Sequence, residues 1–347
     1  MNRQRLRAIT AKYPKRSIAV VGDFCLDRYL EIDPGRQETS LETSLSVHNV
    51  VNVRSQPGAA GTILNNLVAL GIGSIHPVGF CGMDGEGYEL QRALRAEGSA
   101  VQLGHFFPSD GRRTFTYCKP LLLHPGKPPE ELNRLDTKNW TPTPLALQDR
   151  LAAAVTELAS KVDAIILMDQ VDVPETGVIT QPVLDAVAAL NKARPLFLVI
   201  ADSRRGLKGY PPVIFKMNAA ELAALTGASG KLSLAEIKEA AVALARKQGH
   251  RVFVTMSENG ILGAGPRGDV EHVPTLPVRG EIDIVGAGDA VTANLTAAMA
   301  AGANLRESIE IANAAASIVI HQLGTTGTAT VKQIEQCLFE AGQFQNS

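Results

Sequence analysis

Residues 281–302 read E-I-D-I-V-G-A-G-D-A-V-T-A-N-L-T-A-A-M-A-A-G, and this stretch decides the fold. The alternation of Ile282 and Ile284 indicates the end of a β-strand. The run of small residues after it predicts a helix that ends at Gly302. A strand that passes through a glycine-rich turn into a helix is typical of α/β proteins, and it places the turn at the edge of a sheet.

The turn itself is a candidate anion site. It is formed by Gly286, Ala287 and Gly288. Glycine lets the backbone approach a ligand closely, and the first turn of a helix leaves N–H groups unpaired at the positive end of the helix dipole. Asp289 follows directly, and a carboxylate at such a site is suited to accept a proton while charge develops on a phosphate. The alternative is an ordinary turn in which Asp289 only stabilises the helix dipole.

The composition is that of a globular protein. The chain has 347 residues, of which 45% are hydrophobic, and its formal net charge is −1, so it lacks the basic surface of nucleic-acid-binding or membrane-surface proteins. The cysteines show no C-x-x-C spacing and the histidines no H-x-x-x-H pair, which disfavours disulfides and zinc sites. The basic N-terminus lacks the apolar core of a signal peptide and predicts a short surface helix. No apolar run could span a bilayer. We expect a cytoplasmic protein with neither nucleic acid nor membrane as a partner.

Strand and helix patterns alternate along most of the chain. Strands are expected at residues 17–21, 164–168, 196–201, 213–217 and 252–255, and helices at residues 145–161, 180–193, 235–248 and 305–322. This alternation predicts an α/β fold with a mostly parallel central sheet and helices on both faces. Polar residues follow strands of like sense, namely Asp23, Asp169, Asp202, Asn218, Thr255 and Asp289. We therefore expect one shared cleft along that edge of the sheet.

Two segments need separate interpretation. Residues 121–144 are rich in proline and lack periodicity, which predicts an irregular insertion. Residues 263–268 spell G-x-G-x-x-G, the dinucleotide-binding pattern. Pro266 lies inside this pattern, however, and a strand-like segment follows where a helix should begin, so we predict a hairpin turn instead.

Several further motifs occur in an order known from one enzyme family. They are V-V-G-D-F-C-L-D-R-Y from Val20, P-G-A-A-G-T-I-L-N-N from Pro57, V-G-F-C-G-M-D-G-E-G from Val78, N-A-A-E from Asn218, T-M-S-E-N-G from Thr255 and A-N-A-A-A from Ala312. Together with D-I-V-G-A-G-D, this set resembles the ribokinase (PfkB) family of carbohydrate kinases. The resemblance implies a single ribokinase-like kinase domain over residues 1–347, with a small β-strand lid inserted at about residues 30–56 and 104–120. Exposed lid edges need partners, so a homodimer through the lid is expected.

The same resemblance implies an ATP-dependent kinase that acts on a hydroxyl of a sugar or sugar phosphate. Asp289 would be the general base, and the N–H groups of Gly286, Ala287 and Gly288 would hold the transferred group. The substrate would contact Asp27, Asp23, Gly58, Thr62, Asp169 and Gln170. The nucleotide would contact Asn218, Thr255, Ser257, Gly260 and Asn313. Glu221 would hold Mg²⁺ through water, and K⁺ would bind at Asp283 and Val285.

Within the family, N-R-L-D at residues 133–136 and H-Q-L-G-T-T at residues 321–326 look closest to the heptose 7-phosphate kinase domain of ADP-heptose synthesis. No H-x-G-H motif of a second, nucleotidyltransferase-like domain is present, so we expect a kinase domain alone. Arg112, Arg113 and Lys119 could bind a substrate phosphate or could be solvated lid charges.

Departures from the family pattern concentrate in the sugar pocket. Ala59 stands where the family usually has glycine, and Thr62 where asparagine usually contacts the sugar. Gln170 replaces an aromatic residue of the heptose branch, and Val285 replaces a threonine of the C-terminal signature. The sequence therefore does not identify the sugar substrate. A nucleoside kinase of the same fold and a non-catalytic sugar-binding protein remain as alternatives.

Overall fold

The computed structural model describes residues 1–228 and 230–340. Within them, the main sheet has the strand order β16-β15-β14-β13-β12-β11-β1-β6-β7. The strands from β7 to β14 are parallel, and β15 and β16 add an antiparallel edge. Their bounds are β1 Ser17–Gly22, β6 Ser74–Gly82, β7 Phe106–Ser109, β11 Ala164–Asp169, β12 Leu198–Ser203, β13 Ile214–Asn218, β14 Val252–Thr255, β15 Ile261–Ala264 and β16 Val270–Val273. The expected parallel sheet is confirmed.

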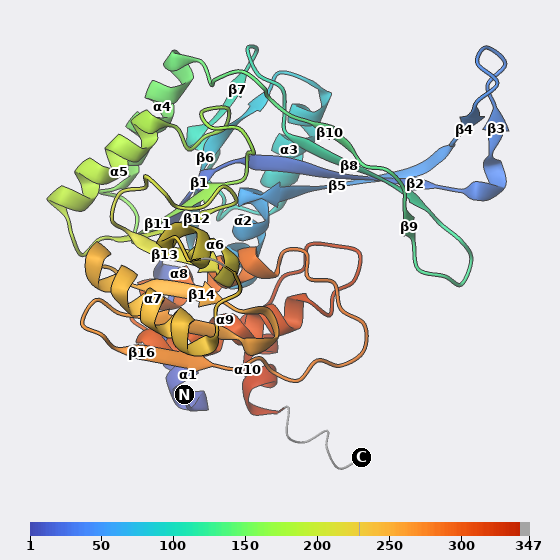
Figure 1. Ribbon diagram of the computed structural model, residues 1–347. Coiled ribbons are helices and arrows are strands. Elements are labelled where there is room, and N and C mark those ends of the chain that lie inside the picture. Colours follow the sequence, from blue (N-terminus) through green and yellow to red (C-terminus); the bar gives the residue numbers. More distant parts are fainter. Residues whose placement is uncertain (229, 341–347) are drawn as a thin grey trace.

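Helices cover both faces of this sheet (Figure 1). Successive side chains of a strand point to opposite faces, so Ile18 and Val20 enter one hydrophobic core and Ala19 and Val21 the other. The first core also takes α1 Arg3–Thr10, α2 Ala60–Ala69, α3 Gly85–Ala96, α8 Ala287–Ala300, α9 Leu305–Val319 and α10 Val331–Phe339. The second takes α4 Leu145–Leu158, α5 Gln181–Ala193, α6 Ala219–Thr226 and α7 Leu234–Gln248. None of the helices in the described ranges is both long and apolar enough to cross a bilayer.

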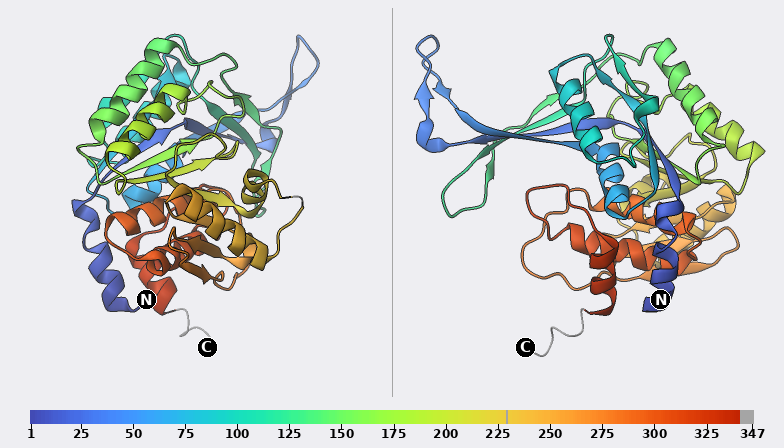
Figure 2. Two further views of the ribbon diagram at one scale, coloured as in Figure 1. Left: turned by 60° about the vertical axis from the view of Figure 1, so that its left-hand side comes forward. Right: turned by 180° about the vertical axis from the view of Figure 1, so that it is seen from behind.

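A second sheet projects from this body as a long arm (Figures 1 and 2). Its strand order is β10-β8-β2-β5, with β9 paired to β8, and the β3–β4 hairpin lies at its tip. The bounds are β2 Phe24–Ile32, β3 Glu38–Thr39, β4 Ser46–Val47, β5 Val50–Ala59, β8 Thr116–Leu122, β9 Glu130–Glu131 and β10 Leu135–Thr137. Short 3₁₀ turns lie at Tyr13–Lys15, Pro34–Arg36, Leu103–His105 and Ser257–Asn259.

The arm differs in its boundaries from the expected lid. It comprises residues 24–59 and 116–137, whereas residues 30–56 and 104–120 were expected. Strand β7 at residues 106–109 belongs instead to the edge of the main sheet. The proline-rich segment expected to be irregular supplies β9 and β10, because pairing with β8 satisfies its backbone.

The predicted strand end at Ile282 and Ile284 is wrong. Both side chains are exposed, by 43% and 73%, and the segment is a loop. The Asp283 N–H donates to the carbonyl of Ile320 at the end of α9, so this loop packs on a helix end and has no neighbouring strand. The predicted helix is confirmed as α8, and it is followed by Gly302 at a φ of +86°.

The predicted hairpin in the G-x-G-x-x-G segment is confirmed. Strands β15 and β16 pair in antiparallel register on either side of it. The Gly265 N–H donates to the Asp269 carbonyl, and the Gly268 N–H donates to the Gly265 carbonyl. A dinucleotide fingerprint needs a helix after the glycines, and a strand stands there instead.

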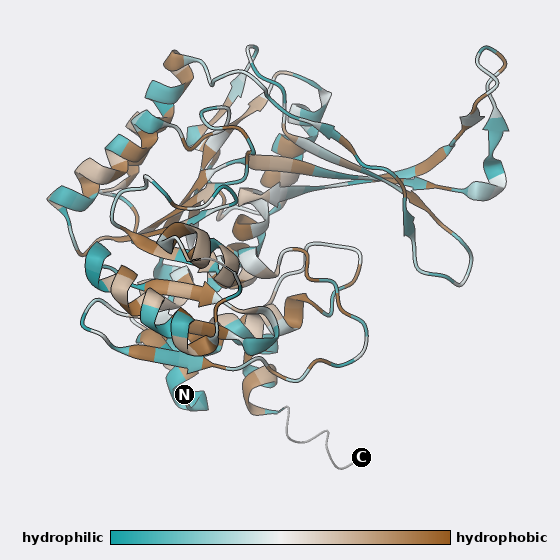
Figure 3. Ribbon diagram, viewed as in Figure 1, coloured by the Kyte–Doolittle hydropathy of each residue, from teal (hydrophilic) through white to brown (hydrophobic). Residues whose placement is uncertain are grey.

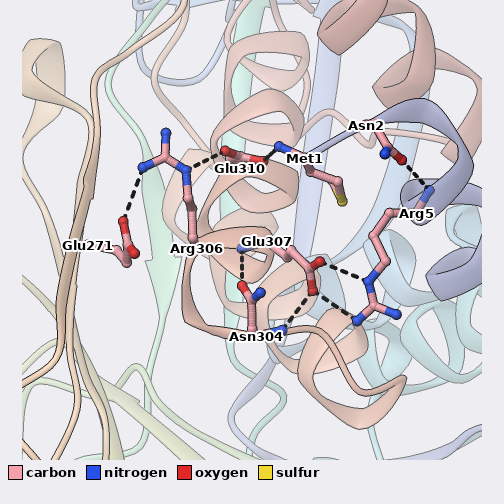
Figure 4. A network of polar contacts seen from close by, with 8 residues as sticks. All are labelled: Met1, Asn2, Arg5, Glu271, Asn304, Arg306, Glu307 and Glu310. Atoms are coloured by element: carbon pink, nitrogen blue, oxygen red, sulfur yellow. Dashed lines mark hydrogen bonds and ion pairs between the residues drawn. The ribbon is translucent and has the colours of Figure 1, made fainter.

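The basic N-terminus forms the expected surface helix, α1, and acidic side chains hold it against the body (Figure 4). Arg5 makes two hydrogen bonds to Glu307, of 2.8 Å and 3.0 Å, and the amino group of Met1 lies 2.6 Å from Glu310. Leu6 and Ile9 are buried on the inner face. Exposed ion pairs contribute little by themselves, so the apolar face of α1 supplies most of the docking energy.

Candidate functional site

The carboxylate of Asp289 lies where three other elements converge. Its electrostatic neighbours are Asp202 from β12, Lys216 from β13 and Asp27 from β2. Asp289 and Asp202 therefore lie close together at the carboxyl ends of the strands, where the sequence predicted a cleft. The root of the arm adds Asp27, since the chain passes from β1 into β2 after a single residue, Asp23.

The turn before Asp289 has the features of an anion site. Gly286 caps α8 with a φ of +80°, a conformation that favours glycine. A side chain there would also lie 3.3 Å from Thr326. For Gly286 and Gly288, the described structure gives the backbone N–H no hydrogen-bond partner. The Ala287 N–H, expected as a third donor, instead donates to the Ile284 carbonyl over 3.2 Å, so two of the three expected donors are unpaired in this conformation.

The surroundings of Asp289 favour its protonated form more than water does. Burial is the largest cause, the charges of Asp202 and Asp27 add to it and Lys216 opposes it, and together they raise the pKa of Asp289 to about 7. A carboxyl group with a pKa near neutral is well matched to general-base catalysis. The side chain is therefore suited to take a proton from a bound hydroxyl.

A buried lysine beneath the turn escaped the sequence analysis. The Lys216 ammonium lies 2.7 Å from the Asp202 carboxylate, and the Thr292 hydroxyl donates to the same oxygen over 2.9 Å. Lys216 and Asp202 expose only 7% and 11% of their side chains. The sequence feature that could have revealed Lys216 is a lysine inside the otherwise apolar strand I-F-K-M-N. A lysine in a buried strand needs a charged partner, so it indicates a second buried charge nearby.

Asp23 does not offer its carboxylate to a substrate, contrary to the sequence-based expectation. The residue is fully buried, and its oxygens accept hydrogen bonds from the backbone N–H groups of Gln170, Val171 and Val178. Burial and the charge of Asp169 raise the pKa of Asp23 to about 7. Asp23 thus fixes the loop after β11.

Asp169 is also directed inward. It is fully buried, and one oxygen accepts hydrogen bonds from Ser203, Arg205 and Tyr210 at 2.7–2.9 Å. In this conformation protein donors occupy that oxygen, while the other carboxylate oxygen is buried without a hydrogen-bond partner in the described structure. Gln170, the next residue, is only half-buried and lines a small pocket with Tyr117 and Trp140.

Replacement of Asp23 by alanine should strongly destabilise the fold. It would leave three backbone N–H groups buried without acceptors, at roughly 1–3 kcal/mol each before relaxation. We expect the free energy of unfolding in urea to fall by about 2–5 kcal/mol. The exposed Asp149 provides the control, since Asp149→Ala should change it by less than about 0.5 kcal/mol. Equal stability of Asp23→Ala and Asp149→Ala would contradict the structural role of Asp23.

Asp27 lies near the start of β2, at the root of the arm. It is 5% exposed, and a side chain at Gly58 would lie 2.7 Å from its carboxylate, so Gly58 makes the room that Asp27 fills. Burial raises the pKa of Asp27, while Lys119 and Arg134 lower it. Asp27, Gly58 and two cations are therefore grouped at the root of the arm.

Thr62 lies near this group on α2. It is 1% exposed, and its hydroxyl oxygen is buried without a hydrogen-bond partner in the described structure. Its methyl group lies 3.5 Å from the place where a Gly286 side chain would begin. The Thr62 side chain thus packs behind the turn, and its unpaired hydroxyl is a candidate ligand contact.

Arg112 does not point into the cleft. Its guanidinium donates to the backbone carbonyls of Thr141, Pro142 and Thr176, and the residue is 5% exposed. These contacts join two loops of the body and leave no role in binding a substrate phosphate. Lys119 differs, because the residue is only half-buried and its ammonium lies over the Tyr29 ring.

The expected nucleotide residues lie beyond the turn, at the ends of β13 and β14. Asn218 and Thr255 are paired in register on these neighbouring strands. Ser257 and Gly260 shape the next loop, both with positive φ angles, of 49° and 83°. Asn313 on α9 donates to the carbonyl of Pro274 over 2.6 Å, which anchors the loop that follows β16.

The candidate ion sites are each partly engaged within the protein. Glu221 closes a capping box on α6, in which it accepts from the Asn218 N–H over 2.7 Å. Its other carboxylate oxygen has no hydrogen-bond partner in the described ranges. Asp283 accepts from the Val285 N–H over 3.0 Å. The described residues contain no cluster of three or more metal-ligating side chains.

Residues 202–332 match a family described as pfkB family carbohydrate kinase. The bifunctional protein HldE of Azorhizobium caulinodans is 30% identical over 309 residues, which cover 89% of this chain and 61% of that protein. HldE of Pelobacter propionicus is 28% identical over 336 residues, covering 96% and 66%. The chain thus spans less than two thirds of these relatives.

Solved structures show the same fold. Arabidopsis thaliana ribokinase complexed with ribose and ATP has a TM-score of 0.68 at 20% identity, covering 93% of this chain and 99% of that one. Phosphofructokinase-2 from Escherichia coli in complex with substrates and products has a TM-score of 0.69 at 17% identity, covering 93% and 98%. The chain thus has a ribokinase-like fold, and its residues 202–332 match the family described as pfkB family carbohydrate kinase.

Proposed function

We propose that this chain transfers the γ-phosphate of ATP to a hydroxyl of a sugar phosphate. The observation that carries the proposal is Asp289, a carboxyl group with a pKa near neutral next to a turn with unpaired N–H groups. This pair of features fits phosphoryl transfer, in which catalysis is mostly positioning and electrostatic stabilisation.

In the proposed reaction, Asp289 accepts the proton of the attacking hydroxyl. The N–H groups of Gly286 and Gly288 stabilise the charge on the transferred group, and a small rotation of the turn would add Ala287. A bound Mg²⁺ would neutralise phosphate charge, and the unpaired oxygen of Glu221 suits a water of its hydration shell. Asp283 and the backbone carbonyl of Val285 are proposed to bind K⁺. Asn218, Thr255, Ser257, Gly260 and Asn313 are proposed to line the nucleotide site.

Two cations near Asp27 favour a phosphorylated sugar over a neutral one. Lys119 and Arg134 both act on Asp27, and Arg134 also lies 4.7 Å above the Tyr117 ring. A lone carboxylate suits sugar hydroxyls, whereas two cations beside it suit a substrate anion, although Arg134 is already paired with Asp136 at 2.7 Å. Together with the resemblance of residues 133–136 to the heptose branch, they support a heptose phosphate as the first substrate to test.

The arm is proposed to act as a lid. Gln56 on β5 donates to the Thr326 hydroxyl over 2.6 Å and accepts from Thr325 over 3.2 Å, so the arm contacts the loop behind Gly286. Apolar side chains lie exposed along it, and Figure 3 shows hydrophobic colour on its strands. Val50, Val51, Val53 and Leu135 are 43–63% exposed. A homodimer through the arms would cover them.

A substrate panel tests the proposed function. Purified protein with labelled ATP and Mg²⁺ is offered hexoses, hexose phosphates, heptoses, heptose phosphates and nucleosides. We expect turnover with a sugar phosphate and a KM at least about 10-fold lower than for the matching neutral sugar, the value of one charged contact. Phosphorylation of nucleosides alone would replace the proposal by a nucleoside kinase. Sugar binding without turnover on any substrate would favour a binding protein.

A further inference from the structure

Lys216 is the most unusual charged residue of the site. Its ammonium is buried, and a buried cation is tolerated only with a charged, hydrogen-bonded partner. Asp202 provides that partner at 2.7 Å, and Thr292 holds the same carboxylate oxygen from α8. An apolar side chain of similar length would fill this space without the desolvation cost, so a neutral packing role does not explain the pair.

The Lys216 ammonium lies close to the turn that precedes Asp289. A side chain at Gly288 would begin 3.2 Å from the Lys216 Nζ, so the charge lies directly beneath the second residue of α8. Gly288 is one of the two residues whose N–H stays free at the turn. The ammonium therefore lies beside a residue of the turn where a transferred phosphate would be held.

We propose that Lys216 is a positioning residue that places a fixed positive charge beneath the anion-holding turn and keeps Asp289 available as a base. The inference rests on the proposed function and assigns it one further residue. In a site shielded from water, a charge fixed before the reaction stabilises developing negative charge without reorganisation. Asp202 and Thr292 hold the ammonium in place.

The charges around Lys216 agree with this role. Burial is the largest single influence and lowers the pKa of Lys216, but Asp202, Asp289 and Glu221 together outweigh it, so the pKa is raised and the ammonium stays charged. Asp289 faces Lys216, Asp202 and Asp27, and Lys216 is the one of these three that lowers its pKa. Loss of Lys216 should therefore raise the pKa of Asp289.

The test uses two variants of the full chain. Lys216→Met removes the charge but leaves Asp202 buried and unpaired, which can weaken folding by itself. Lys216→Met/Asp202→Asn removes both charges and keeps the buried site neutral. The control is Lys192→Met on the exposed surface of α5. Thermal unfolding is measured for all of them, so that folding and binding effects are separated.

The readout is binding of Mg·ADP and of Mg·ADP with aluminium fluoride, a planar anion that mimics the transferred phosphoryl group. We expect Mg·ADP affinity to change little in any variant. Affinity for the mimic should fall at least about 10-fold in both Lys216 variants. This is less than the roughly 100- to 1000-fold loss of rate that follows removal of one oxyanion-hole donor in an enzyme. In Lys216→Met, the acidic limb of kcat/KM should also move to higher pH.

The outcomes distinguish failure of the role proposed for Lys216 from failure of the proposed kinase function. A double variant that binds the mimic like the wild type shows that Lys216 only neutralises Asp202, and overturns its positioning role. Wild-type protein that turns over no substrate of the panel and does not prefer the mimic to Mg·ADP removes the proposed function itself. Turnover by the wild type with weak mimic binding by both variants supports both.

Discussion

Replacement of Asp289 by asparagine is expected to lower kcat at least about 100-fold, the lower range for loss of a general base. Asparagine keeps the size of the side chain but cannot accept the proton of the attacking hydroxyl. Nucleotide affinity should change little, because the turn and the ends of β13 and β14 are untouched. Steady-state kinetics on the best substrate of the panel, with calorimetry for Mg·ADP, measures the two effects separately.

The pH profile provides an independent check of the same residue. The base must be ionised to act, and the pKa of Asp289 is raised to about 7 by burial and by Asp202. In the wild type, kcat/KM should therefore fall as the pH falls through about 7, and this limb should be absent from Asp289→Asn. Asp149→Asn, on the exposed side of α4, is the control. Wild-type turnover in Asp289→Asn would remove the base assignment.

The sequence predicted the backbone of the site better than its side chains. The turn before Asp289 could be found because glycine at a positive φ and a helix start both leave local sequence signals. The parallel sheet followed from the alternation of strands and helices, which also depends on local pattern. These features needed no knowledge of which distant residues come together.

The direction of a side chain at a strand end could not be predicted in the same way. Asp23 and Asp169 both follow strands of the correct sense, yet loop N–H groups take the oxygens of Asp23, and Ser203, Arg205 and Tyr210 hold Asp169. Tertiary packing determines these partners, because a buried carboxylate is oriented by the hydrogen-bond donors that surround it in the fold. Position at the sheet edge thus places a residue near the cleft without placing its carboxylate in the cleft.

Long-range pairing explains the other differences. Ile282 and Ile284 alternate like a strand, but the fold brings the end of α9 beside them in place of a strand. The proline-rich segment after β8 forms strands because β8 itself supplies the partners. In both cases the presence or absence of a neighbouring strand, and not the local sequence pattern, decides whether the segment joins a sheet.

Replacement of Asp27 by asparagine is expected to raise the KM for the sugar about 10- to 100-fold, as for loss of a hydrogen bond to a charged group. Asp27 is 5% exposed, and no hydrogen bond to its carboxylate occurs within the described residues. Both carboxylate oxygens can therefore accept hydrogen bonds from sugar hydroxyl groups, whereas asparagine offers one acceptor oxygen and no charge. The KM for ATP should change little, because the expected nucleotide residues lie on β13, β14 and α9.

A second variant tests the geometry of Asp27 without removing its charge. In Gly58→Ala, the new methyl group would lie 2.7 Å from the Asp27 carboxylate and push it out of place. The sugar KM should rise here as well, whereas Gly35→Ala on the outer arm should leave it unchanged. An equal rise in KM for ATP and sugar in Asp27→Asn would place Asp27 outside the sugar site. The charge of Asp27 is the smallest of the influences on the pKa of Asp289. At saturating sugar, we therefore expect kcat of Asp27→Asn to change only slightly.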